Sequence, residues 1–209
     1  MQQRAAETRQ AIIEAAADLF ARDGYRATGL RDIVNRASVT QGAFYFHFDS
    51  KNDVAEEIIR QQHATSIATT QAVMSSNESG LISIVRLSDA LAEQVVNDAT
   101  VRAGLRLSTE NADELSAAAV LPYRDWLAAA RVLLERARMR GELREGLDLD
   151  TAAELVIGAF SGTQFLSAIL GGPDRLRDRL NRMWRVLFVA LTDDVSHPVF
   201  DQLIPDHVY

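Results

Sequence analysis

The sequence predicts an all-α protein with a three-helix N-terminal domain, residues 1–52, and a larger helical domain, residues 53–209. Apolar residues recur at helical spacing along most of the chain, and no segment alternates convincingly with the period of a β-strand. Only 4 Pro and 11 Gly occur among 209 residues, which argues against a turn-rich β-protein. With 47% hydrophobic and 24% charged residues, the composition is that of a globular protein and excludes general disorder.

The first predicted helix, Thr8–Arg22, is amphipathic, and Gly24 ends it at the usual left-handed position. Its inward residues are Ile12, Ile13, Ala16, Leu19 and Phe20. Thr28 is predicted to cap a short second helix, Leu30–Arg36. A three-residue turn, 37–39, then leads to a further short helix.

Thr40 is predicted to cap this third helix, Gln41–Phe46, and Ser50 to cap a fourth that runs from about Lys51 to Val73. Asp53 occupies the capping-box position of the fourth helix. Further helices are predicted at Leu81–Val96, Val101–Ser108, from about Pro122, at Thr151–Leu170 and at Arg175–Thr192, while Asn111–Ala119 is ambiguous.

Two short helices separated by a three-residue turn are typical of a helix-turn-helix, in which the second helix enters the major groove of DNA. Gly42 costs about 1 kcal/mol in a helix relative to Ala, which suggests that another backbone comes close there. Tyr45 carries a hydroxyl suited to a phosphate oxygen, and Lys51 at the next helix start is suited to the same phosphate. The alternative is that the aromatic residues Tyr45, Phe46 and Phe48 only form a core, and Phe44 and Phe48 are expected to pack against Ile12, Leu19 and Ile33.

Charge is distributed unevenly along the chain. The first 51 residues hold 7 basic and 6 acidic side chains, whereas the remaining 158 hold 15 basic and 23 acidic ones. A nearly neutral front end on an acidic body is compatible with binding a polyanion, although this signal is weak by itself.

The segment Thr8–Val54 resembles the DNA-binding domain of TetR-family transcriptional regulators. The resemblance is carried by Ala17-Asp18-Leu19-Phe20, Gly24-Tyr25, Thr28, Ile33-Val34, Val39-Thr40, Gly42-Ala43, Tyr45-Phe46-His47-Phe48 and Lys51. It implies DNA contacts from Thr40, Gln41, Gly42, Tyr45, His47 and Lys51, with Thr28 as a further candidate. Many relatives have Lys at the position of Gln41, and Gln can instead bridge N6 and N7 of adenine. The family also implies an all-α body that binds a ligand, dimerises and releases double-stranded operator DNA.

A second resemblance extends into the body. Val101-Arg102-Ala103-Gly104-Leu105-Arg106-Leu107-Ser108, then Trp126 and Gly162-Thr163, are similar to the γ-butyrolactone autoregulator receptors of actinomycetes. That subgroup senses small lipophilic lactones and butenolides, so Trp126 and Thr163 are implied pocket residues. Phe160, Leu91 and Gln62 complete the predicted pocket, in which Gln62 and His63 supply polar contacts unless they are simply solvated. Trp126 also fits a core position.

The helix Thr151–Leu170 has few polar residues on either side. Val156, Phe160, Thr163 and Ser167 share one face, while Gly158, Gly162, Phe165 and Ile169 share the opposite face. We expect the second face to meet a partner subunit, with Leu180 and Leu187 from the stripe of the last helix completing a homodimer interface. The alternative is the central helix of a monomer.

Other classes of function have less support. The four histidines show no metal-ligand spacing, and no P-loop, GxSxG or GxGxxG motif is present, so we expect no enzyme activity, cofactor or metal. A purely structural adaptor leaves Gly42, Tyr45 and His47 unexplained. The polar start of the chain and a polar-interrupted apolar run at Leu155–Pro173 predict a cytoplasmic protein without a membrane span. The alternative ligand is an antibiotic or other hydrophobic compound, sensed by a regulator of efflux or antibiotic biosynthesis.

Overall fold

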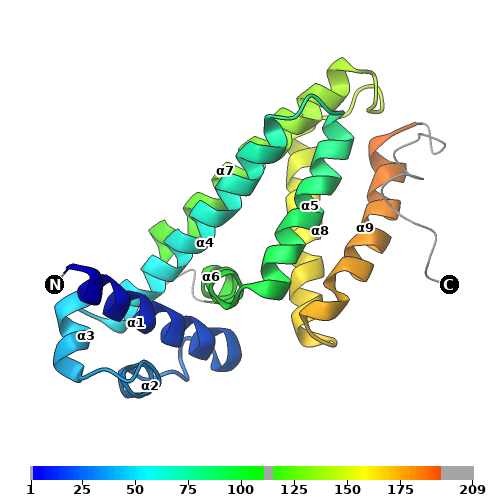
Figure 1. Cartoon of the computed structure of the whole chain (residues 1–209). Coiled ribbons are helices and arrows are strands. Elements are labelled where there is room, and N and C mark those ends of the chain that lie inside the picture. Colours follow the sequence, from blue (N-terminus) through cyan, green and yellow to red (C-terminus); the bar gives the residue numbers. More distant parts are fainter. Residues whose placement is uncertain (1, 111–114, 194–209) are drawn as a thin grey trace. The chain divides into compact units, whose positions relative to one another are not determined.

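The computed structural model describes residues 2–110 and 115–193, and every regular element in these two ranges is helical. The helices are α1 (Gln2–Asp23), α2 (Leu30–Arg36), α3 (Gln41–His47), α4 (Lys51–Met74), α5 (Gly80–Asn97), α6 (Ala99–Glu110), α7 (Ser116–Met139), α8 (Leu149–Ile169) and α9 (Leu176–Leu191), with a 3-10 turn at Pro173–Arg175 (Figure 1). The predicted all-α class is confirmed.

The chain divides into two compact units. Unit 1 comprises Met1–Ser66 and Asn97–Tyr123, and unit 2 comprises Ile67–Val96 and Arg124–Tyr209. The divisions fall inside α4 and α7 and before the last residue of α5, whereas the domain boundary predicted from the sequence, between residues 52 and 53, lies in the first turn of α4. Unit 1 gains α6 because this helix packs along α1.

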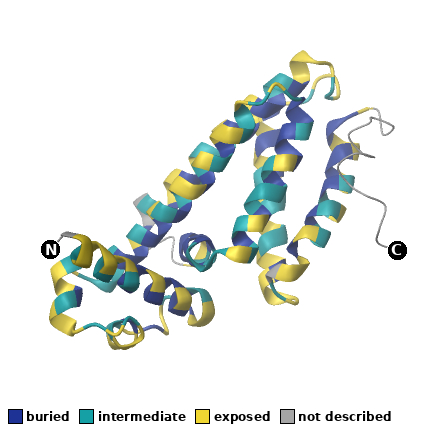
Figure 2. Cartoon of the chain, viewed as in Figure 1, coloured by how far each residue is buried: buried dark blue, intermediate teal, exposed yellow. Residues whose placement is uncertain are grey.

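The core of unit 1 joins α1, α2, α3 and α4, as their apolar spacing predicts. Phe44 and Phe48 lie in one buried cluster with Ile12, Leu19 and Ile33, which confirms their predicted packing. Figure 2 colours the buried residues of the helices dark blue. Ala103, Leu107 and Leu115 extend this cluster to α6 and to the residue before α7.

Two predicted caps are confirmed and one is wrong. Thr40 Oγ1 accepts from Ala43 N at 3.1 Å, and Ser50 Oγ accepts from Asp53 N at 3.2 Å. The N-cap of α2 is Gly29, whose N–H donates to Asp32 Oδ2 at 2.8 Å. Thr28 is instead buried and donates its hydroxyl to Gly24 O, because a hydroxyl one residue early serves the preceding turn better than the helix.

The start of α7 also differs from the prediction. Pro122 was expected near the start of this helix, yet α7 begins at Ser116 and Pro122 lies inside it. Proline removes a backbone donor and costs about 3 kcal/mol in a helix interior. Leu115 and Ala118 pack on the core of unit 1, and this burial offsets the cost.

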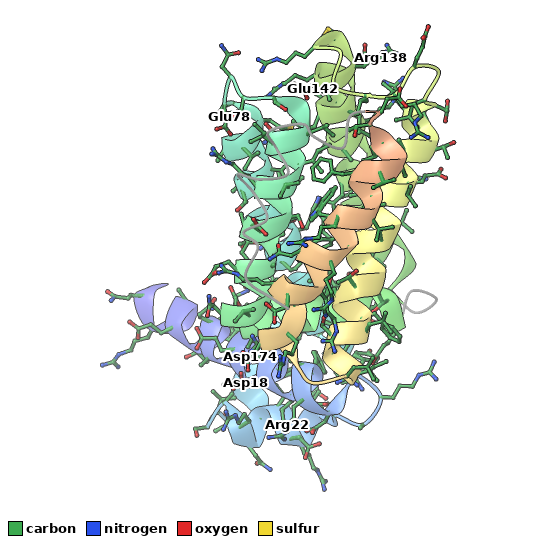
Figure 3. The ribbon with its side chains drawn as sticks, turned by 90° about the vertical axis from the view of Figure 1, so that its right-hand side faces the viewer. Asp18, Arg22, Glu78, Arg138, Glu142 and Asp174 are labelled. Atoms are coloured by element: carbon green, nitrogen blue, oxygen red, sulfur yellow. The ribbon has the colours of Figure 1, made fainter. Side chains whose placement is uncertain are left out.

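In unit 2, α8 and α9 pack along each other. Close packing also fixes the start of α5. A Cβ on Gly80 would lie 2.0 Å from Leu133 O, and Ser79 Oγ at the same end donates to Glu142 Oε2 at 2.7 Å (Glu142 is labelled in Figure 3).

Candidate nucleic-acid interface and its helical body

Helix α3 has one buried and one exposed face. Phe44 is fully buried and anchors the helix to the core of unit 1. Gln41 and Gly42 are exposed, and Tyr45 is 50% exposed with its ring edge-on to Phe44 at 5.6 Å between centroids. The helix therefore exposes a polar, partly aromatic surface, and the buried Phe44 on its opposite face fixes its position.

Gly42 has no packing reason to be glycine inside the described chain. A Cβ built there meets only Thr40 Oγ1, at 4.0 Å. The space in front of this backbone is open, as it must be if an external backbone approaches it.

The aromatic run after Gly42 is only partly core. Phe48 is buried, whereas Phe46 is 78% exposed and packs edge-on against His47 at 5.0 Å. The sequence analysis did not single out Phe46 as a surface residue. The signal was present, because three consecutive aromatic side chains 100° apart on a helix cannot all face one core.

His47 is half-buried at the C-terminal end of α3. With Phe46 it lines a cleft of about 490 Å³ in unit 1, whose lining also includes Asp49, Asp53 and Glu56. Nearby, hydrogen bonds from Arg60 and then Arg9 lower the pKa of Glu57 to about 2. The cleft thus carries four carboxylates against the two guanidinium groups of Arg9 and Arg60, and this acidic excess disfavours a phosphate there.

Lys51 has partners within its own unit. Its Nζ donates to Tyr25 O and Thr28 O, both at 2.9 Å, and lies 4.0 Å from the Tyr25 ring centroid. The amine and the buried Thr28 thus stabilise the turn between α1 and α2. This internal role replaces the predicted Thr28–DNA contact and takes two of the three protons that Lys51 was expected to offer a phosphate.

Ion pairs involve several of the basic side chains of unit 1. Arg36 pairs with Asp18 at 2.7 Å and Arg22 with Asp23 at 2.7 Å, and the Arg22 pair lowers the pKa of Asp23 (Asp18 and Arg22 are labelled in Figure 3). Such exposed pairs contribute little to stability. They do reduce the net positive field that these arginines offer to DNA.

The residues predicted to form a ligand pocket lie in both units. Leu91, Trp126, Phe160 and Thr163 are half-buried in unit 2. Gln62 belongs to unit 1, where a Cβ on Gly104 would lie 2.5 Å from Gln62 Cβ. Gln62 is 2% exposed and its Oε1 has no hydrogen-bond partner among the described residues, so one buried acceptor remains unsatisfied.

The fully buried tryptophan of unit 2 is Trp184, which the sequence analysis missed. Its Nε1 donates to Ser88 Oγ at 3.0 Å, and its ring packs on Phe188. On α5, Ser83 Oγ and Gln94 Oε1 are buried without hydrogen-bond partners in the described ranges. The helical spacing of Trp184 from Leu180 and Leu191 was a readable signal for the core position.

The two faces of α8 are as predicted. Val156 and Ser167 are buried, whereas Gly158 and Gly162 are exposed and Phe165 and Ile169 are 57% and 61% exposed. Leu155, Leu166 and Leu170 add to this exposed apolar face. By length and composition α8 meets the requirement for a membrane span, but a single such helix is weak evidence.

Burial within the chain speaks against the predicted interface residues of α9. Leu180 and Leu187 are 0% and 6% exposed, because the stripe to which they belong forms the core of unit 2. The apolar residues that α9 leaves exposed are Val186 and Val189, 72% and 53% exposed. A stripe already covered by its own chain has no area left to bury against a partner.

A helix-turn-helix whose inner face is buried, followed along the chain by an all-α body, is typical of one class of transcriptional regulator. The family model for bacterial regulatory proteins of the tetR family matches residues 12–58, and the model for the tetracyclin repressor-like C-terminal domain matches residues 78–193. The chain belongs to the TetR family and is a DNA-binding transcriptional repressor.

Its relatives include the A-factor receptor protein of Streptomyces griseus, 32% identical over 197 residues that cover 94% of this chain and 67% of the relative. A γ-butyrolactone receptor structure (ArpA-like protein) has a TM-score of 0.79 at 33% identity and covers 96% of this chain and 94% of that chain. CprB from Streptomyces coelicolor, in complex with its biological operator sequence, has a TM-score of 0.79 at 31% identity and covers 96% of both chains.

Proposed function

We propose that the chain is a cytoplasmic homodimeric repressor that binds a pseudo-palindromic operator and is released by a γ-butyrolactone or butenolide-like molecule. The observation that carries the DNA-binding part is the exposed face of α3, where Gln41, Gly42 and Tyr45 stand on a helix anchored by Phe44. In this proposal Gln41 reads a base edge and Tyr45 holds a phosphate. Thr40 and His47 lie at the two ends of the same helix and contribute further contacts.

The helix-turn-helix domain of one chain is small and nearly neutral, so it binds DNA weakly by itself. Two such domains, one from each protomer, are needed for useful affinity. The exposed apolar face of α8 supports a dimer, because Gly158 and Gly162 allow a second helix to approach closely beside Phe165 and Ile169. We place Val186 and Val189 at its edge. Two-fold symmetry then requires half-sites whose centres are about 34–36 Å apart, or a multiple of that distance.

The ligand class is supported by the receptors named above. The half-buried Trp126 and Phe160 of unit 2 are the proposed apolar walls, with Leu91 as a further apolar candidate and Thr163 as a hydrogen-bonding group. Small-molecule sites are mostly apolar with a few fixed polar groups, which suits a lactone on an acyl chain.

Salt-dependent retention on duplex DNA tests the DNA-binding part. A repressor is retained at low salt and released as salt rises, with specific duplex competing better than scrambled duplex. Absence of retention contradicts the proposal. Native mass spectrometry of protein purified from its own host then identifies the ligand: a co-purified lactone or butenolide supports the proposed class, and an antibiotic points to the alternative regulator.

A further inference from the structure

The segment Val101–Ser108 carries the likeness to one subgroup of receptors, yet neither DNA contact nor the proposed pocket uses it. The structure places it in α6, which packs along α1 within unit 1. Its apolar residues Val101, Ala103, Leu105 and Leu107 are buried. Arg106 lies between Leu105 and Leu107 in the sequence, is itself half-buried, and hydrogen-bonds to specific groups.

Arg106 binds the C-terminal end of α1. Its Nη1 donates to Ala21 O at 3.0 Å and to Phe20 O at 3.4 Å, and its Nε donates to Glu110 Oε1 at 2.9 Å. The last four carbonyls of a helix lack intrahelical partners, and the helix dipole favours a cation there. The guanidinium therefore adds a cationic cap to the end of α1, where the N–H of Gly24 already donates to Phe20 O at 3.1 Å.

The turn that follows lies against the same cation at Gly24 and is bound by a second cation, Lys51. Gly24 has φ +86°, and a Cβ on it would lie 3.0 Å from Arg106 Nη2. Thr28 Oγ1 donates to Gly24 O at 2.9 Å, and Lys51 binds the carbonyls of Tyr25 and Thr28. The carbonyls of residues 20, 21, 24, 25 and 28 are thus all bound by side chains, two of which are cationic and come from α6 and α4.

This turn leads directly into α2, the first helix of the DNA-binding pair. We propose that Arg106 is a positioning residue for DNA recognition: by fixing the end of α1 and the 24–28 turn, it sets the placement of α2 and α3 without touching DNA. The inference rests on the proposed DNA-binding function. It makes α6 part of the DNA-binding machinery, although α6 lies about fifty residues beyond α3 in the sequence.

The test compares Arg106→Met and Arg106→Lys with Arg138→Met in the full-length protein. Arg138 is a matched control, because it is an exposed arginine on α7 that also pairs with a glutamate on its own helix and its loss changes the net charge equally. Affinity is measured by fluorescence anisotropy at several salt concentrations. The probes are a duplex selected from a random library by the parent protein and a scrambled duplex, at a temperature where circular dichroism shows every variant folded.

We expect Arg106→Met to bind the selected duplex about tenfold more weakly, with unchanged salt slope and unchanged affinity for the scrambled duplex. Arg106→Lys recovers part of the loss, because an ammonium still donates to the α1 carbonyls, and Arg138→Met behaves as the parent. A salt slope reduced by about one assigns Arg106 to a phosphate and overturns the proposal. Unchanged specific affinity, or a Lys variant no better than the Met variant, also overturns it.

If Arg106→Met is unfolded at every temperature tested, Arg106→Lys alone decides: partial loss of specific affinity at unchanged salt slope supports the proposal, and parental affinity overturns it. Failure of the parent protein to select any duplex is a different result. It contradicts the proposed function before any variant is compared.

Discussion

Truncating Phe165 to alanine is expected to weaken the homodimer strongly while leaving each chain folded. The side chain is 57% exposed on the apolar face of α8, so most of its burial is still available to a partner. Complete burial of a phenylalanine side chain contributes about 1.5–3 kcal/mol, and slightly more than half of that remains to be gained here. In a two-fold symmetric interface each protomer contributes the same residue, which doubles the loss.

The expected cost is therefore about 2–3 kcal/mol, or about 30- to 150-fold in the dimer dissociation constant. Sedimentation velocity over a dilution series measures this constant, and thermal unfolding monitored by circular dichroism verifies that the variant is folded. Met139→Ala is the control, because Met139 is 74% exposed on α7, outside the proposed interface. A Phe165→Ala dimer as strong as the parent, or a parent that is monomeric at micromolar concentration, refutes the assignment of this face.

Four further substitutions separate the proposed roles. Gln41→Ala should cost about 1–3 kcal/mol of binding free energy on the cognate operator and relax the sequence preference at one base pair. Unchanged sequence preference in a selection experiment with Gln41→Ala contradicts the base contact. Tyr45→Phe should instead weaken binding to all duplexes alike. Trp126→Ala should bind operator normally but resist release by the ligand. Nearly full release needs about 5 kcal/mol of differential affinity between the two states, and one aromatic wall supplies part of it. Normal release in a gel-shift titration places the pocket elsewhere. Leu180→Ala should lower the free energy of unfolding by about 2–5 kcal/mol in urea, and a stable variant that dissociates would return this residue to the dimer interface.

Sequence patterns predicted most of the helices and the apolar faces of several of them, because burial of an amphipathic stripe is the main force that makes a helix in a protein. The cluster around Phe44 and the two faces of α8 follow from spacing alone. Spacing does not say what covers an apolar face. That is why Leu180 and Leu187 were assigned to a partner subunit although their own chain buries them.

Local signals were wrong where tertiary contacts outweigh them. By local rules Pro122 marks the start of a helix. Packing of the residues before it extends α7 toward the N-terminus, so that the helix begins at Ser116. Thr28 is a good cap by type, yet its hydroxyl serves the turn before α2. The partners of Lys51 and Arg106 are carbonyls far away in the sequence, and no spacing rule identifies such pairs. The residue-level DNA, ligand and dimer contacts proposed above remain predictions.

The central claim, ligand-controlled release of operator DNA, has one direct measurement. The preformed complex of the parent dimer with its selected fluorescent duplex is titrated with a γ-butyrolactone or butenolide while anisotropy is recorded. The account predicts that anisotropy falls to the value of free duplex, in a saturable manner, and that the complex of Trp126→Ala does not respond over the same range. A complex that persists at saturating concentrations of these lactones, or a duplex that never binds, contradicts it.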